Sequence, residues 1–189
     1  MVKGAAALYT KEFFELVKGR LNPGGVATVF VQLYESSPET VKSEVATFLE
    51  VFPQGTVWAN TQQGRGYDLV LLGQAEPAPI DVDRVEQRLR SPAYAPVAHS
   101  LAEVGIRSAV DLFATFAGQG PQLSRWLADA QVNRDRDLRL QYLAGLGVNR
   151  YEQEAIYRGM VADVTFPDGL FTGSPARLKA LKTAMGWGR

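Results

Sequence analysis

A run of apolar residues without alternation constrains the fold of this chain more than any other feature of its sequence. The run covers residues 26–33, is rich in β-branched side chains, and follows the turn-forming residues 22–25. A strand with one face in water alternates apolar and polar residues, whereas a strand buried on both faces does not. Residues 26–31 therefore predict a central strand, with a neighbour on each edge and helices on both faces. At a sheet edge, the same strand would be an apolar template for pairing.

One helix is expected before this strand in the sequence and one after it. Thr10 is placed to cap a helix over residues 10–21, whose apolar residues recur at helical spacing. Ser37 followed by Pro38 is typical of an N-cap and the first helical position, and apolar residues continue at helical spacing to Phe52. The order up to this point is helix, strand, helix.

Two more strands are expected at residues 56–60 and 67–72. The loop between them holds Gly64 and Gly66 and predicts an antiparallel hairpin, in which the glycines provide backbone freedom rather than a phosphate cradle. The last strand would then be an antiparallel strand at the end of an otherwise parallel sheet. Three strands are too few for such a sheet, so the sequence predicts missing strands, supplied either upstream of Met1 in a longer chain or by another chain.

The remainder of the chain is expected to be helical. Residues 74–79 form a proline-punctuated linker, and no strand is expected beyond it. Helices are expected near residues 82–90, 94–104, 107–116, 121–129, 137–145, 150–162 and 175–186.

Composition excludes several classes of function. Twenty basic residues balance twenty acidic ones, so there is no positive field for nucleic acid. The chain has no cysteine and a single histidine, His99, which argues against a metal site. No apolar stretch approaches the roughly 20 residues that span a bilayer. These features predict a cytoplasmic protein without a membrane span, a metal or a nucleic-acid partner.

Several weak motifs in the first part of the chain occur together in a specific order. They are the segment from Gly4 to Phe14, the turn and strand start at 21–26, the strand end at 32–35, the Val-Phe-Pro at 51–53, the strand with Trp58, and the Gly-Tyr-Asp-Leu-Val-Leu-Leu-Gly at 66–73. This order and spacing resemble the spermidine synthase family, including its relatives fused to membrane transporters. The resemblance covers about residues 2–75, and from about residue 80 it extends only to the helical tails of the transporter-fused group.

The resemblance implies a fold and a division of the chain. The fold would be α/β, the C-terminal part of a Rossmann-like class I methyltransferase sheet, with parallel strands plus an antiparallel hairpin strand and an α-helical C-terminal extension. Residues 1–75 would be the C-terminal half of the Rossmann domain, and 76–189 the helical extension. A full-length parent would transfer an aminopropyl or methyl group from an S-adenosylmethionine-type donor.

The family's cofactor and catalytic motifs are expected to lie before Met1. In the family, a glycine-rich turn after the first strand holds the cofactor, an acid after the second takes the ribose hydroxyls, and an Asp motif after the fourth carries catalysis. Aminopropyl transfer needs a carboxylate that deprotonates and positions the amine. No catalytic residue is therefore assigned here. No cofactor is expected in this chain alone, and S-adenosylmethionine or its decarboxylated form is implied for a full-length parent.

Two residues match positions that bind substrate in the family. Gln32 lies at the carboxyl end of the predicted strand, where ligands bind in open α/β sheets, and Tyr34 follows two residues later. A Gln at this position helps to hold the polyamine in the family. The alternative for Gln32 is a solvated strand end. Residues 60–66 depart from the family because they lack its Tyr-Pro-Ser-Gly-like turn, which leaves the activity of a parent open.

Two other polar features are interpreted without a functional role. His99 has no acid or nucleophile at useful spacing and is expected to be structural or solvated. The alternating charges of residues 133–139 largely cancel, which favours a solvated helix start over an anion site.

Two other functions remain open beside the transferase fragment. One is a non-catalytic interaction module, in which the strand at 26–33 or the helical tail pairs with a partner chain or forms a homo-oligomer. The other is a tail that follows the membrane spans of a transporter. The sequence does not decide between these hypotheses.

Overall fold

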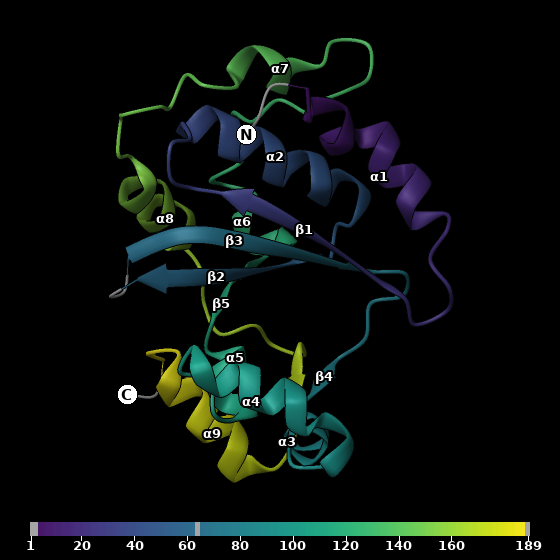
Figure 1. Ribbon diagram of the computed structural model, residues 1–189, viewed down its shortest axis with the longest axis vertical. Helices are drawn as coiled ribbons and strands as arrows, with labels where there is room; N and C mark the ends of the chain where they lie inside the picture. Colours follow the sequence, from purple (N-terminus) through teal and green to yellow (C-terminus); the bar gives the residue numbers. More distant parts are fainter. Residues whose placement is uncertain (1–3, 63–64, 188–189) are drawn as a thin grey trace. The chain divides into compact units, whose positions relative to one another are not determined.

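The computed structural model describes residues 4–62 and 65–187, and its fold is mixed α/β. The chain forms two compact units (Figure 1). The first combines the residues up to Pro77 with Ala117–Val164, and the second combines Ala78–Phe116 with the residues from Thr165 on. The family division at residues 75 and 76 stays a prediction.

The first unit contains the main sheet and the helices that pack on it. Its elements are η1 (Ala6–Tyr9), α1 (Lys11–Lys18), β1 (Val26–Gln32), α2 (Pro38–Val51), β2 (Thr56–Gln62), β3 (Arg65–Gln74), α6 (Gly120–Leu123), α7 (Arg139–Leu143) and α8 (Gln153–Val161), with β5 (Phe116–Gln119) beginning at the boundary between the units. The expected helix starts are confirmed. Ser37 Oγ accepts the Thr40 N–H at 3.2 Å, and Thr10 Oγ1 accepts the Phe13 N–H at 3.2 Å.

The second unit is mostly helical, as expected. Its elements are β4 (Ile80–Asp81), α3 (Val82–Leu89), η2 (Pro92–Tyr94), α4 (Ala95–Glu103), α5 (Ala109–Phe113), β6 (Phe171–Thr172) and α9 (Pro175–Ala184). Glu86 is buried and accepts the Ala109 N–H at 2.8 Å, which joins α3 to the start of α5. The expectation of no strand beyond the linker at 74–79 was wrong, because three strands of two to four residues form there through long-range pairing.

The antiparallel strand lies inside the main sheet rather than at its end. The strand order is β1-β3-β2-β5, and β3 pairs antiparallel with both β1 and β2. The expected end position was wrong because the hairpin uses only one edge of β3, and its other edge is free to take β1. The fold class is confirmed: two parallel strands, a helix between them in sequence and an inserted antiparallel strand are compatible with the C-terminal part of a Rossmann-like methyltransferase sheet. Gly64, the expected turn glycine, lies outside the described residues.

β1 is an edge strand of the described sheet, and only one of its faces is buried. Val26 and Phe30 are 51% and 46% exposed, whereas Val31 is buried. The prediction of burial on both faces was therefore wrong. The lack of alternation shows that β1 is apolar on both faces, but it does not show whether another element covers the second face.

The covered face of the sheet packs against the first two helices. Figure 1 shows α1 and α2 on the same side of β1, β3 and β2. Phe14 of α1 packs edge-on against Phe48 of α2, which stacks on Phe52 at 4.8 Å. Gly73 of β3 lies so close that a Cβ there would be 2.5 Å from the Phe52 ring. These aromatic rings form the centre of the core of the first unit.

Asn133 is fully buried and joins segments that are far apart in the sequence. Its Nδ2 donates to the carbonyls of Ala6 and Tyr9, each at 2.9 Å, and its Oδ1 accepts the Leu140 N–H at 3.1 Å. Its own N–H donates to Thr47 Oγ1 of α2 at 2.8 Å. The expectation that the charge run at 133–139 is solvated was therefore wrong at its first residue, which holds η1, α2 and α7 together.

No helix in the described parts of the chain is long and apolar enough to cross a membrane.

Candidate functional site

Gln32 and Tyr34, the two expected substrate-binding residues, lie together at the carboxyl end of β1. Gln32 is half-buried, and its Nε2 donates to the Tyr34 carbonyl at 2.7 Å. The Tyr34 ring stacks on Tyr67 with centroids 4.7 Å apart and planes 24° apart. The Gln32 side chain and the stacked pair of Tyr34 and Tyr67 therefore lie at the end of β1.

A row of polar side chains crosses the sheet at this end. Gln32 of β1 is opposite Asp68 of β3, which is opposite Asn60 of β2. Directly opposed residues project to the same face, so the three side chains are neighbours. Burial raises the pKa of Asp68, and a hydrogen bond from the Asn60 side chain partly opposes this shift.

α8 lies beside the carboxyl ends of the parallel strands, which are on the left in Figure 1. A Cβ at Gly66 would lie 2.4 Å from Tyr157 Cβ, so glycine at this position allows α8 to pack against β3. Burial raises the pKa of the Tyr157 hydroxyl.

Sequence reasoning missed Asp68 and Asn60 as members of this site. The only sequence signal for them was their polarity within apolar strands. Their relation to Gln32 depends on the register of three strands, which local patterns do not specify. A partly buried carboxyl group, two carboxamides and an aromatic pair are groups that bind an ammonium ion or an amine.

The connections that follow β1 and β2 do not have the form of a donor-binding turn. The connection from β1 to α2, residues 33–37, has no glycine, and β2 leads into β3 rather than into a helix. Neither connection is therefore a glycine-rich strand-to-helix turn of the kind that binds a nucleotide-like group. Among the residues that the structure describes, no three potential metal ligands gather either.

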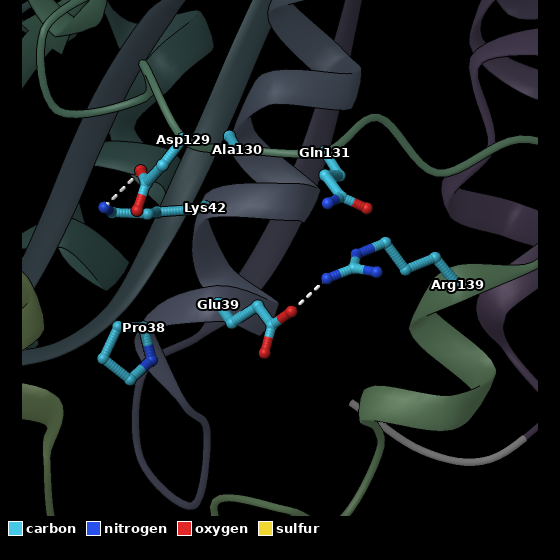
Figure 2. Close-up of a pocket in the computed structure, with 7 residues that line it drawn as sticks. All are labelled: Pro38, Glu39, Lys42, Asp129, Ala130, Gln131 and Arg139. Atoms are coloured by element: carbon cyan, nitrogen blue, oxygen red, sulfur yellow. Dashed lines mark hydrogen bonds and ion pairs between the residues drawn. The ribbon is translucent and has the colours of Figure 1, made fainter.

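A second candidate site is a hollow of about 330 Å³ beside the start of α2. Figure 2 shows its lining residues: Pro38, Glu39, Lys42, Asp129, Ala130, Gln131 and Arg139. Lys42 Nζ lies 2.6 Å from Asp129 Oδ1, and Arg139 forms a second ion pair with Glu39. Sequence reasoning missed this hollow because its walls are about ninety residues apart along the chain.

His99 takes no part in either site. It lies on α4 with an exposed side chain, 3.4 Å from Glu103 at the next helical turn. This is the solvated position that the sequence predicts.

Comparison with known proteins gives one partial structural likeness. No family model matches the chain, and no curated protein matches it. The crystal structure of a probable spermidine synthase from Corynebacterium glutamicum is similar to 68% of this chain, with 24% sequence identity and a TM-score of 0.39. The match spans 41% of that synthase chain. A likeness of this extent carries no argument about activity.

Proposed function

We propose that this chain is the acceptor-binding half of a spermidine-synthase-like transferase, in which the row of Gln32, Asp68 and Asn60 binds an amine substrate. The observation that carries the proposal is this row, which lies at the carboxyl ends of the parallel strands. Ligands of open α/β sheets bind at that edge. The resemblance of residues 2–75 to the spermidine synthase family gives independent support.

The roles of the side chains follow from their chemistry. Asp68 is the anionic partner for an ammonium group of the acceptor, and the two carboxamides can accept the remaining N–H groups. The stacked rings of Tyr34 and Tyr67 offer a π-face to the methylene chain or the cation. The donor and the base that deprotonates the amine would come from a different segment or chain, so we expect the chain alone to be inactive.

Replacing Asp68 by Asn is expected to weaken amine binding at least tenfold, because the substitution removes the charge that pairs with the ammonium group. We expect the diamine putrescine to bind the parent chain with a Kd of about 1 mM and to shift the backbone amide signals of Gln32, Asn60 and Asp68. The uncharged isostere 1,4-butanediol should cause no such shifts. Titration followed by ¹⁵N-resolved NMR measures both effects.

A carboxylate outside the row provides the control. Glu15→Gln makes the same chemical change on an exposed part of α1 and should leave the putrescine Kd unchanged. If Asp68→Asn binds putrescine as tightly as the parent chain does, the amine role of the row is wrong.

The free edge of β1 supports a second candidate function, an interaction module whose partner completes the sheet. Leu33 N–H donates to the Tyr67 carbonyl and Ala75 N–H to the Gly25 carbonyl, so the odd-numbered residues of β1 bond to β3. The backbone groups of the even-numbered residues therefore point away from β3. The Tyr9 hydroxyl donates to one of them, the Phe30 carbonyl, at 2.9 Å. A strand of a second copy would fit this edge.

Under this second candidate, Thr28→Pro is expected to convert a dimer into a monomer. The Thr28 N–H points to the free edge, so proline removes a donor for the incoming strand while the β3 ladder keeps its hydrogen bonds. Thr28→Ser retains the N–H and should stay dimeric. Light scattering after size exclusion gives the masses. A folded parent that is monomeric, with fast hydrogen exchange at Thr28 and Phe30, argues against the dimer.

A further inference from the structure

The hollow at the start of α2 presents two opposite charges on each of its facing walls. Glu39 and Lys42 come from the first turns of α2, while Asp129 and Arg139 come from the segment opposite. Each ion pair joins one wall to the other, as Figure 2 shows. The lining therefore carries no net charge, and it shares no residue with the row at the carboxyl ends of the strands.

This pattern of charges disfavours a ligand that carries only positive or only negative charge. A simple anion that approaches Lys42 or Arg139 also meets the carboxylates already paired with them, and a simple cation meets the reverse arrangement. A zwitterion can replace one of these ion pairs without leaving a charge unpaired, because its carboxylate takes the cation and its ammonium group takes the carboxylate that is displaced. No charge is left uncompensated in the exchange.

The side chains of the two cations are more buried than those of the two anions. The side chains of Lys42 and Arg139 are 19% and 27% exposed, against 57% for Glu39 and 74% for Asp129. Lys42 Nζ also lies 5.7 Å from the centre of the Trp126 ring, a cation–π contact. The cations are thus the more buried members of the two pairs, and the carboxylates lie nearer to solvent.

Arg139 has hydrogen-bonding capacity to spare. Its guanidinium carries five N–H donors, and it donates to Glu39 through Nη2. Its Nε is buried without a hydrogen-bond partner among the described residues. A planar carboxylate is the group that a guanidinium binds in a bidentate manner. The volume of the hollow lies at the lower end of ligand pockets, which range from about 300 to 1,000 Å³, so the ligand is small.

We propose that this hollow binds a small zwitterion of the α-amino acid class, with its carboxylate on Arg139 and its ammonium group between Glu39 and Asp129. The four charged side chains form the complementary set, and Gln131 lies on the wall between Asp129 and Arg139.

The test compares glycine and L-alanine with matched ligands that keep only one charge. N-acetylglycine retains the carboxylate, and glycinamide retains the ammonium group. In titrations of the full chain followed by ¹⁵N-resolved NMR, we expect the two amino acids to shift the amide signals of Lys42, Gln131 and Arg139. They should bind at least tenfold more tightly than either single-charge ligand.

Two variants and one control locate the site. Arg139→Gln and Asp129→Asn should each weaken glycine binding at least tenfold, and Asp129→Asn changes a side chain that is 74% exposed. Arg136→Gln makes the same substitution at an exposed arginine outside the hollow and should bind glycine like the parent chain.

Three outcomes would overturn the proposal. One is that N-acetylglycine or inorganic phosphate binds as tightly as glycine, which would make the hollow an anion site. Another is that Asp129→Asn and Arg139→Gln both retain the glycine affinity of the parent. The third is that no amide signal shifts when glycine is added at fifty times a Kd of about 1 mM.

Discussion

The free energy of unfolding is expected to fall as the pH rises from about 5 to about 8, by roughly 1 kcal/mol per pH unit at the steepest point. The cause is Glu44 of α2, which is 3% exposed and has a carboxyl oxygen without a hydrogen-bond partner among the described residues. Burial raises its pKa from 4.5 to about 8. In this range the folded protein retains the proton that the unfolded chain has lost, so raising the pH favours unfolding.

Glu44→Gln should remove most of this pH dependence and stabilise the protein at pH 8, because the amide stays neutral at every pH. Urea unfolding of the parent and of the variant at pH 5, 6.5 and 8 measures the difference. Tyr9 is the neighbouring titratable group, and burial together with the charge of Glu44 raises its pKa above 10. It therefore stays neutral throughout this range.

The exposed Glu50 on the same helix supplies the control for Glu44. Glu50→Gln should leave the slope of the parent unchanged, because Glu50 lies at the surface and its ion pair with Lys11 is of the exposed kind that contributes little to stability. Burial also raises the pKa of Asp68, which acts in the same direction, so the difference between parent and Glu44→Gln isolates Glu44. A parent stability that rises between pH 5 and 8 would contradict the buried, protonated state.

Asn133→Ala is expected to lower the free energy of unfolding by about 4 kcal/mol. The substitution removes three hydrogen bonds, so the carbonyls of Ala6 and Tyr9 and the N–H of Leu140 all lose the side-chain partner that they share. Each orphaned group costs about 1–3 kcal/mol. Urea unfolding measures the loss, and hydrogen exchange of the Leu140 amide should accelerate in the variant.

Asn22→Ala is the matched control for Asn133. Asn22 is exposed in the turn before β1, so we expect a change within about 0.5 kcal/mol. An Asn133→Ala variant as stable as Asn22→Ala would mean that the segments around Asn133 hold together without its side chain.

The helices up to residue 51 were predicted well because their signals are local, whereas the helices expected at 121–129 and 137–145 are only four and five residues long. The N-caps at Thr10 and Ser37 act within one turn of chain, and the structure confirms both. Strand positions were also predicted, because β-branched runs identify them. Strand order was not, because the insertion of β3 between β1 and β2 depends on pairing between residues about forty positions apart.

The candidate sites divide in the same way. Gln32 and Tyr34 were predicted from the end of a strand, and the structure places them together. Asp68 and Asn60 joined them only through sheet register, and the hollow formed only where α2 meets the segment that contains Asp129 and Arg139. No local pattern relates residues so distant.

The sequence by itself determined the kinds of elements and their order up to residue 74, because apolar periodicity and helix caps are properties of neighbouring residues. Only the tertiary structure decided that β1 lies at an edge with an exposed face, that Asn133 is a buried link, and that four charges surround one hollow. The physical reason is that burial and charge pairing depend on which distant segments come into contact. Patterns among neighbouring residues do not specify those contacts.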